Sequence, residues 1–335
     1  MSQPLISILI PFKNTAKFLP ECINSILVQT YTNWEVIAIN DHSTDTSLET
    51  LQSYQAKDER IKVFNNDGVG IINALRTAYN LSTGDYITRM DSDDMMTSER
   101  LLIMLRALLE KGNRHLAVGQ VKYFSNRGIS NGYERYAMWL NNLTISGNNF
   151  TEIYKECVIP SPCWMVSRKD LDYCNAFESD RYPEDYDLAF RFYANKLKVI
   201  PCDTILLHWR DYDTRTSRTS EHYAQNYFLD IKLHYFLKLD YQPLKTLVVW
   251  GAGNKGKTIA KVLLEQNIDF HWVCDNPKKI GKEIYGKEMQ SFQVLNEIKS
   301  SQSIITVANV EAQEEIMVYF KKQNRLPMLD YFFFC

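Results

Sequence analysis

The run RMDSDD at residues 89–94 places three carboxylates, those of Asp91, Asp93 and Asp94, close together in the chain. Close carboxylates repel one another, so such a cluster is costly unless a cation lies among them. Hard oxygen ligands suit Mg²⁺ or Mn²⁺, and either ion can also bind the oxygens of a diphosphate. The alternative is an acidic turn in solvent that caps the helix expected at residues 95–111. The run therefore indicates either a divalent-metal site or a helix cap.

A second acidic pair, Glu184-Asp185, opens an amphipathic helical pattern over residues 184–196. Backbone N–H groups at a helix N-terminus stabilise and orient carboxylates. The pair is therefore either a simple helix cap or a source of the carboxylate that general-base catalysis requires. Asp187, two residues further on, is expected to be a charge on the helix surface.

A glycine-rich motif, GAGNKG at residues 251–256, lies between a strand pattern and a helix pattern. Such a turn can cradle a phosphate at the helix N-terminus, and an acid about 20 residues further on can bind a ribose. Two alternatives remain open: the module serves docking or oligomerisation, or the glycines only pack the strand against the helix. The residues of this second candidate nucleotide site are Gly251, Gly253, Gly256 and Asp275.

The elements that must position these residues follow from the hydrophobic pattern. The first hundred residues alternate strand and helix patterns, which predicts an α/β fold with a mostly parallel sheet flanked by helices. Ligands bind at the carboxyl ends of the strands in such sheets. The expected strands cover residues 5–12, 34–41, 60–66 and 85–91. Polar residues stand at or just beyond their ends: Asp41, Asn65, Asn66, Asp91 and Asp93. Their placement predicts a binding site along this edge.

The rest of the chain predicts further strands and a second domain. Residues 125–160 lack clean periodicity and are expected to form loops with a short helix. Strands are expected at residues 115–124, 162–168 and 198–210. The predicted organisation is a first domain at residues 1–220, a helical connector at 221–243 and a small Rossmann-like α/β domain at 244–335.

Composition excludes several classes of protein. The 335 residues suffice for two hydrophobic cores, and a formal net charge of −2 lacks the basic field of a nonspecific nucleic-acid binder. No apolar run approaches the roughly 18 residues that a membrane span needs, so membrane contact is expected to be peripheral, if present. The seven cysteines include no C-x-x-C pair. They are interpreted as reduced thiols of a cytoplasmic protein.

Five motifs occur in a fixed order: IPFKN (10–14), INDHSTD (39–45), TGDYITRMDSDD (83–94), PEDYDLAFR (183–191) and LLHWR (206–210). In this combination the chain resembles the family 2 inverting glycosyltransferases, which have the nucleotide-sugar-binding GT-A fold. The resemblance covers roughly residues 4–220. It identifies the predicted parallel sheet as the nucleotide-sugar-binding domain.

The resemblance also implies roles for individual residues. The donor nucleotide would contact Pro11, Phe12, Asn14, Asp41, Asn66, Arg89 and Asp91. Asp91 and Asp93 would hold Mn²⁺ or Mg²⁺, and Asp94 is the usual third acid. Asp185 of the E-D motif would be the general base beside Glu184. Trp164 and Arg210 are weaker candidates for contacts with the sugar or the acceptor.

Two positions depart from the family's pattern. Relatives often carry a His two residues beyond the Arg of the W-R motif, whereas Arg210 is followed by Asp211 and Tyr212. His208 lies two residues before the Arg and is therefore only a weak candidate for a metal ligand. Leu75-Arg76 stands where the family commonly has Arg-Asn, which puts diphosphate and sugar contacts from that helix in doubt.

The leading hypothesis is a metal-dependent inverting glycosyltransferase that uses a nucleoside-diphosphate sugar, expected to be UDP-linked. Its acceptor would be a hydroxyl of a glycan or lipid-linked glycan in surface-polysaccharide synthesis, at the inner face of the membrane. The alternatives are an NAD(P)-dependent oxidoreductase built on GAGNKG and a non-catalytic scaffold that binds sugar nucleotides. Clustered acids argue against the scaffold, because a dead site has no use for them. The C-terminal domain could also mediate homo-oligomerisation.

Overall fold

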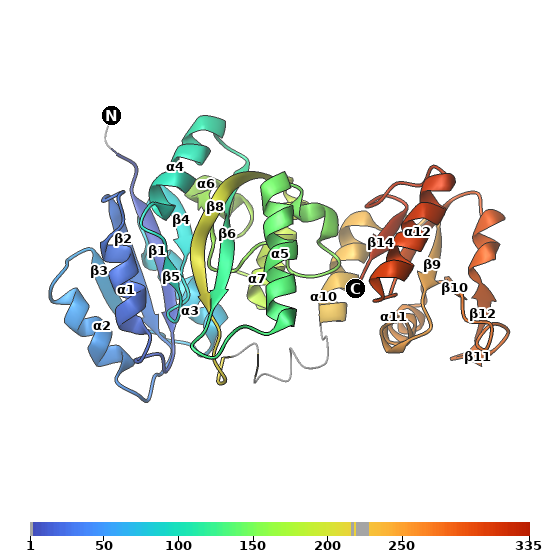
Figure 1. Cartoon of the computed structure of the whole chain (residues 1–335), viewed down its shortest axis with the longest axis horizontal. Coiled ribbons are helices and arrows are strands. Elements are labelled where there is room, and N and C mark those ends of the chain that lie inside the picture. Colours follow the sequence, from blue (N-terminus) through green and yellow to red (C-terminus); the bar gives the residue numbers. More distant parts are fainter. Residues whose placement is uncertain (1–2, 216–217, 219–227) are drawn as a thin grey trace. The chain divides into compact units, whose positions relative to one another are not determined.

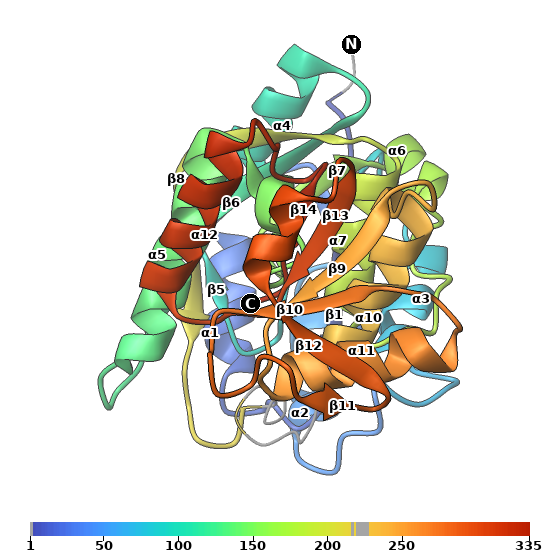
Figure 2. The same ribbon diagram turned by 90° about the vertical axis from the view of Figure 1, so that its right-hand side faces the viewer.

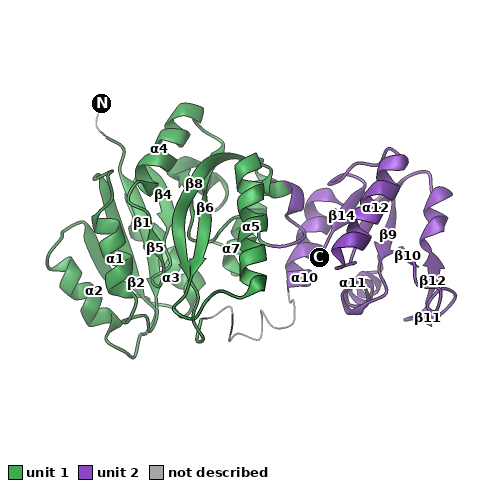
Figure 3. Cartoon of the chain, viewed as in Figure 1, with its two compact units in different colours: residues 1–150, 157–218 green, residues 151–156, 219–335 purple. Residues whose placement is uncertain are grey.

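The computed structural model describes residues 3–215, 218 and 228–335, which fall into two units (Figure 3). Unit 1 contains residues 1–150 and 157–218, and unit 2 contains residues 151–156 and 219–335. The boundary expected at residue 220 and the start of the expected connector, 221–227, lie outside the described residues. None of the described helices combines the length and hydrophobicity that a membrane crossing requires.

Unit 1 is built on an eight-stranded mixed sheet with the order β3-β2-β1-β4-β7-β6-β8-β5 (Figure 1). β3, β2, β1 and β4 run parallel, β7 is antiparallel to both β4 and β6, and β8 is parallel to β6. The strands are β1 (Ile6–Phe12), β2 (Trp34–Asn40), β3 (Ile61–Asn65), β4 (Tyr86–Arg89), β5 (Met95–Met96), β6 (His115–Phe124), β7 (Trp164–Ser167) and β8 (Lys198–Arg210). This mixed α/β sheet confirms the predicted fold class.

Helices connect the strands of unit 1. They are α1 (Leu19–Leu27), α2 (Ser47–Gln55), α3 (Ile71–Leu81), α4 (Arg100–Lys111), α5 (Asn131–Ser146), α6 (Arg168–Tyr173) and α7 (Glu184–Ala194), with a 3₁₀ turn η1 (Asn149–Glu152). Every residue of β1 and β2 is buried, which explains their nearly continuous apolar runs. In α3, the buried Ala74, Leu75 and Ala78 lie on one face.

The region expected to form loops with a short helix contains the longest of these helices, α5, which runs alongside β6 and β8 (Figure 1). Its buried residues Ala137, Leu140 and Thr144 are three and four positions apart, which is the spacing of one helix face. Ser130 caps its N-terminus, and Gly147 ends it in the left-handed conformation. The full length of this helix was not recognised in the sequence, because its buried residues are few and lie among many Asn and Tyr residues.

Unit 2 is a smaller α/β fold whose sheet has the order β11-β12-β10-β9-β13-β14 (Figure 2). Apart from β11, these strands run parallel, as a Rossmann-like module requires. The strands are β9 (Thr246–Trp250), β10 (His271–Cys274), β11 (Glu283–Ile284), β12 (Lys287–Ser291), β13 (Ser301–Ile305) and β14 (Tyr331–Phe333). The helices are α10 (Phe228–Tyr235), the π-helix η2 (Phe236–Asp240), α11 (Asn254–Glu265), the 3₁₀ turn η3 (Phe292–Asn296) and α12 (Val310–Lys322).

Segment 151–156, near the middle of the chain, is part of unit 2. The ring of Tyr154 stacks on Phe334 at 5.2 Å, and its hydroxyl donates to Asp240 at 2.5 Å. The buried Lys232 ammonium donates to the Lys155 carbonyl at 2.7 Å. Phe236 and Phe334 are fully buried, so these aromatic side chains of the connector and the chain end pack inside unit 2.

Packing explains two of the three glycines in the GAGNKG turn. Gly251 has a φ of +133°, and a Cβ there would lie 2.3 Å from the Thr306 hydroxyl. A Cβ on Gly256 would lie 2.1 Å from the carbonyl oxygen of Gly251, so the first turn of α11 fits against β9 only with glycine. A Cβ on Gly253 would meet nothing within 4 Å. The motif is thus largely explained by strand–helix packing.

This packing predicts different outcomes for two glycine substitutions in the same turn. Gly256→Ala should destabilise unit 2 by about 1–3 kcal/mol, because the backbone of the turn must move to admit the methyl group. Gly253→Ala is the matched control and should cost less, because a methyl group there meets no neighbouring atom and only the N-cap preference for glycine is lost. Hydrogen exchange of β9 and α11 peptides at increasing urea would measure both. Equal effects of the two variants would contradict the packing explanation.

Candidate functional site

The carboxyl ends of β1, β2, β3 and β4 lie side by side, and the predicted polar residues follow them. Pairing continues one residue beyond the strands: Asp41 N donates to Phe12 O at 2.8 Å, and Asn66 N donates to Asn40 O at 2.9 Å. The loop after β1 is joined to the acidic turn after β4 by a hydrogen bond of 3.0 Å between the Thr15 and Ser92 hydroxyls. The structure therefore brings the strand-end residues to one edge of unit 1.

Asp41 is a buried carboxylate that accepts hydrogen bonds from the loop after β3. Its Oδ1 accepts hydrogen bonds from Asn66 Nδ2 at 2.9 Å and from Gly70 N at 2.8 Å. Its Oδ2 faces the Lys13 ammonium at 3.5 Å. Burial by itself raises the pKa of Asp41, but the hydrogen bonds from Asn66 and Gly70, together with Lys13, outweigh burial and lower the pKa. Asp41 is therefore ionised at neutral pH and can accept further donors.

The predicted residues in β1 and in the loop after it stabilise this edge of the sheet. Phe12 is 2% exposed, so its ring lies in the core, and Pro11 is buried beside it in the strand. Asn14 adopts a φ of +53°, and its Oδ1 accepts hydrogen bonds from Thr44 N at 2.7 Å and from Asp45 N. These contacts give Asn14 the role of tying the loop after β1 to the loop after β2.

Arg89, at the end of β4, bridges the two acidic motifs. Its Nε donates to Asp91 Oδ1 and its Nη1 donates to Glu184 Oε1, both at 2.8 Å, and the residue is 5% exposed. Burial alone lowers the pKa of Arg89, but the nearby Asp91 and Glu184 carboxylates reverse the effect and raise it. A permanently charged guanidinium thus holds the D-x-D turn against the start of α7.

Asp185 lies in the first turn of α7, where its Oδ1 accepts a hydrogen bond from Tyr186 N at 2.8 Å. Burial and the adjacent Glu184 carboxylate raise the pKa of Asp185 to about 7, although Arg89 acts in the opposite direction. A carboxylate with a pKa near neutrality is suited to accept a proton during a reaction at neutral pH.

The end of β8 surrounds the other two acids of the turn. Arg210 N donates to Asp94 Oδ1 at 2.7 Å, and Arg210 Nε donates to the Asp93 carbonyl at 2.6 Å. Its Nη2 forms a 2.8 Å ion pair with Glu21 of α1, and the Tyr212 hydroxyl donates to Asp93 Oδ2 at 2.8 Å. Arg210, predicted as a contact for sugar or acceptor, is instead 9% exposed and supports the acidic turn.

Asp93 and Asp94 have the features expected of a site that binds a cation. Burial raises the pKa values of both groups, and so does repulsion from Asp91, joined by Asp93 in the case of Asp94, although the Arg215 charge acts in the opposite direction. Asp94 Oδ2 is buried without a hydrogen-bond partner among the described residues. Oxygen donors of this kind suit Mg²⁺ or Mn²⁺, which need only one or two protein carboxylates when phosphate oxygens and water complete the shell. The donor chemistry of Asp91 and Asp93 therefore fits such an ion.

Within the described part of the chain, no three His, Cys, Asp or Glu side chains form a group that could hold a metal ion. His208 therefore does not complete a set with Asp91 and Asp93. It lies on β8 opposite Met95, with its ring edge-on to Phe124. Burial and the nearby Lys122 lower the pKa of His208, which keeps the ring neutral.

Two further side chains lie elsewhere than the sequence predicted. Trp164 is 2% exposed and packs edge-on against Phe192, so its ring offers no face to a sugar. Asp187 is not a surface charge: it is 1% exposed and forms a 2.8 Å ion pair with Arg191. The i, i+4 spacing of Asp187 and Arg191 in α7 could have indicated this pair.

Sequence reasoning also missed residues that hold the site together. Tyr212 and Glu21 contact the acidic turn or its Arg210 support, yet neither belongs to a motif. The available signal was the position of Tyr212 two residues after Arg210, since alternate residues of an extended chain lie on one side.

In unit 2, Asp275 of the second candidate nucleotide site is exposed just beyond β10.

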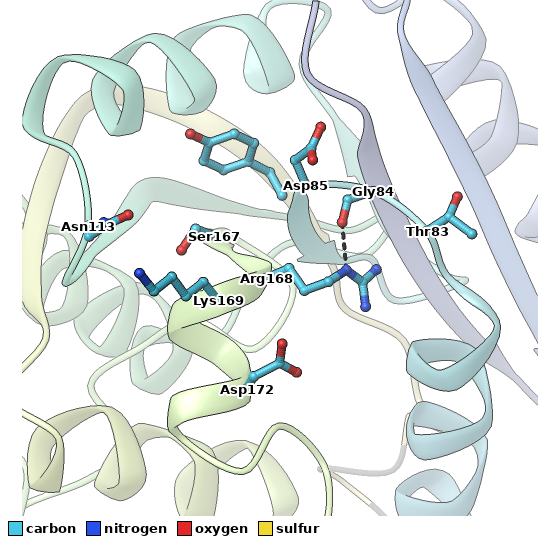
Figure 4. Close-up of a pocket in the computed structure, with 9 residues that line it drawn as sticks. Thr83, Gly84, Asp85, Asn113, Ser167, Arg168, Lys169 and Asp172 are labelled. Carbon is cyan, nitrogen blue, oxygen red and sulfur yellow. Dashed lines mark hydrogen bonds between the residues drawn. The ribbon is translucent and has the colours of Figure 1, made fainter.

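A shallow pocket of about 440 Å³ lies at the amino end of β4, the end opposite to Arg89 (Figure 4). Thr83, Gly84 and Asp85 line it from the loop before β4, and Arg168 and Lys169 line it from the start of α6. The Arg168 side chain forms a hydrogen bond within the pocket wall, because its Nε donates to the Gly84 carbonyl at 2.7 Å (Figure 4). None of the predicted site residues lines this pocket.

Comparisons with known proteins agree with this geometry. The family model described as "Glycosyl transferase family 2" matches residues 7–174, which is half of the chain. Glycosyltransferase GlyA of Streptococcus pneumoniae is 32% identical over 211 residues, covering 61% of this chain and 30% of that protein. Chondroitin synthase of Escherichia coli is 36% identical over 137 residues, covering 39% of this chain and 19% of that protein. The matches thus span a third or less of these relatives' lengths.

Solved structures share the fold at low sequence identity. TarS residues 1–349 of S. aureus, in complex with UDP-GlcNAc, superposes with a TM-score of 0.53 at 18% identity, covering 79% of this chain and 72% of that chain. A mannosyltransferase from Pyrobaculum calidifontis, in complex with GDP-Man and Mn²⁺, also gives 0.53, at 16% identity with 78% and 70% coverage. These similarities establish the GT-A-type fold of unit 1.

The raised pKa of Asp185 makes a prediction about stability. An unfolded Asp titrates near about 3.9, so between about pH 4 and pH 7 the folded protein binds more protons and loses stability as pH rises. Asp185→Asn cannot ionise, so its stability gain over wild type should grow across this window and stay constant above it. Melting temperatures at pH 4.5 and pH 8 would measure the gain.

Asp187→Asn is the control for this measurement, because it lies two residues away on α7. Removing one charge of a buried ion pair costs about 3–5 kcal/mol, so this variant should melt below wild type at pH 8. A stability gain of Asp185→Asn that is the same at both pH values would contradict the raised pKa.

Proposed function

The chain belongs to glycosyl transferase family 2, and from this premise we propose that it transfers a sugar from a nucleoside-diphosphate sugar to a hydroxyl acceptor. The observation that carries the proposal is the Arg89 bridge, which joins Asp91 of the D-x-D turn to Glu184 of the E-D motif. A transferase needs acids on both the donor side and the acceptor side of one reacting centre. The bridge supports the placement of both acids in a single site.

The nucleotide of the donor would bind along the ends of β1, β2 and β3. Asp41 is its main polar contact in this proposal, since Oδ2 keeps capacity to accept a hydrogen bond from a base or a ribose while Asn66 holds Oδ1. We expect a UDP-linked donor. TarS was solved with UDP-GlcNAc, whereas the mannosyltransferase was solved with GDP-Man, so the base is the first property to test.

Asp91 and Asp93 would hold the divalent cation. The ion would supply neutralisation of the negative charge that develops on the departing diphosphate. Arg210 and Tyr212 keep the acidic turn in place, and Arg89 fixes Asp91 through a hydrogen bond to one of its oxygens. The protein's contribution on this side is therefore mainly positioning and charge balance.

Asp185 would be the general base. As the acceptor oxygen attacks the anomeric carbon, Asp185 accepts the hydroxyl proton, the bond to the diphosphate breaks, and the configuration inverts in one displacement. Its pKa of about 7 favours this proton transfer near neutral pH. Glu184 is engaged with Arg89 and serves to position the loop and helix that carry Asp185.

The acceptor proposed here is a glycan or lipid-linked glycan in polysaccharide synthesis on the cytoplasmic side of a membrane. The similarity to chondroitin synthase over part of the chain supports a polysaccharide product. An oxidoreductase based on GAGNKG is less well supported, because packing accounts for Gly251 and Gly256 without a ligand. A non-catalytic scaffold would have no use for buried acids with raised pKa values.

Replacing the base should separate chemistry from donor binding. Asp185→Asn should lower the transfer rate by about 10²–10⁴-fold, the usual contribution of a general base, while the affinity for the donor stays within about twofold. Release of nucleoside diphosphate in the presence of acceptor would measure the rate, and calorimetry would measure the affinity. Transfer at a near wild-type rate would show that the base is another residue.

Removing the proposed metal ligand should change nucleotide binding, whereas removing the base should change only the transfer rate. Asp93→Ala should abolish the dependence of nucleoside-diphosphate binding on Mn²⁺, because the carboxylate that would bridge protein and ion is gone. Asp275→Ala, at the glycine-rich turn of unit 2, is the matched control and should bind as wild type does. Calorimetry with and without Mn²⁺ would measure both variants. Loss of binding in Asp275→Ala alone would move the nucleotide site to unit 2.

A further inference from the structure

Beyond β8 the chain pairs with β6 for one more residue, and its alternate side chains have different partners. Asp211 N donates to the Phe124 carbonyl at 2.9 Å, so pairing with β6 extends one residue past Arg210. The Asp211 carboxylate forms two 2.7 Å hydrogen bonds with Arg218. Arg210 and Tyr212 both bond to Asp93 instead. Because alternate side chains of an extended chain lie on the same side, Arg210 and Tyr212 both reach the acidic turn.

The two side chains constrain different parts of Asp93. Arg210 holds the backbone of the turn, since its Nε binds the Asp93 carbonyl and its N–H binds the Asp94 carboxylate. Tyr212 holds the side chain, because its hydroxyl donates to Asp93 Oδ2 at 2.8 Å. Arg210 thus holds the backbone of Asp93, whereas the Tyr212 hydroxyl holds one oxygen of its carboxylate.

The ring of Tyr212 is fixed without help from its hydroxyl. It packs against Phe18, with ring centroids 4.6 Å apart and planes tilted by 45°. The Arg210 guanidinium lies 4.8 Å from the centroid of the same Phe18 ring.

We propose that Tyr212 is a positioning residue that orients Asp93 for a divalent cation: its hydroxyl occupies Oδ2 and leaves Oδ1 as the oxygen that binds the ion. The proposal rests on the proposed function, in which Asp93 is a metal ligand. Hydrogen-bonded partners of metal-binding carboxylates typically contribute 10–100-fold to metal affinity. Tyr212 would thereby set the metal affinity of the site without contacting the reacting atoms.

The test compares Mn²⁺ affinity of full-length variants at saturating UDP, followed by electron paramagnetic resonance of free Mn²⁺. Tyr212→Phe keeps the ring and removes only the hydroxyl, so its dissociation constant for Mn²⁺ should rise about 10–100-fold. Tyr54→Phe removes a similar hydroxyl bond, to Asn24 at 3.2 Å in the same unit, and should bind Mn²⁺ as wild type does.

A third variant separates orientation from general packing of the turn. Phe18→Leu weakens the support of the Tyr212 ring but keeps its hydroxyl, so its Mn²⁺ affinity should lie closer to wild type than that of Tyr212→Phe. Equal losses in both variants would assign the effect to packing and overturn the proposal. Melting temperatures check that each variant folds.

The failure of this proposal can be told apart from failure of the proposed function. Wild-type Mn²⁺ affinity in Tyr212→Phe, combined with lost affinity in Asp93→Ala, would overturn the role of Tyr212 alone. Unchanged affinity in Asp93→Ala would show that Asp93 is not a ligand, and both proposals would fall together.

Discussion

A buried guanidinium between two carboxylates is the interaction on which the site depends. Arg89 ends a central strand of the sheet, and its two ion pairs reach Asp91 in the following turn and Glu184 at the start of α7. Taking such charges out of water is expensive, and breaking a buried pair by removing one partner costs about 3–5 kcal/mol. Because Arg89 compensates both acids, elements 95 residues apart in the sequence can present carboxylates to one place.

The remaining charges of the site are arranged at the expense of stability. Asp93, Asp94 and Asp185 all have raised pKa values, because burial and neighbouring acids oppose their ionisation. Arg210 and Tyr212 restrain the acidic turn but leave Asp94 Oδ2 without a hydrogen-bond partner among the described residues, and the Arg215 charge offsets only part of the effect of burial. Sites that retain unfavourable charges commonly do so for function. A cation beside Asp93 and a proton delivered to Asp185 would each relieve part of this cost.

The sequence predicted most of the fold and the acids of the site, because both depend on local patterns. Apolar runs identified β1 and β2, amphipathic spacing identified α7, and the two acidic motifs stood at a strand end and a helix start. Features that depend on distant contacts were missed. The α5 helix has a small buried face, Asp187 is buried because Arg191 neutralises it, and Tyr212 acquires its role only when β8 meets the turn after β4. Residues 151–156 join unit 2 through aromatic packing that no local pattern indicates.

The central claim is that one edge of unit 1 binds a nucleoside diphosphate together with a divalent cation. Thermal unfolding against UDP, GDP, CDP, dTDP and NADH, each with and without Mn²⁺, tests it most directly. A ligand at about 100 times its dissociation constant stabilises the folded state by about 2.7 kcal/mol, which shifts the melting temperature by several degrees. We expect a shift with one nucleoside diphosphate, UDP first, that requires Mn²⁺. A shift with NADH alone that is independent of metal would contradict it.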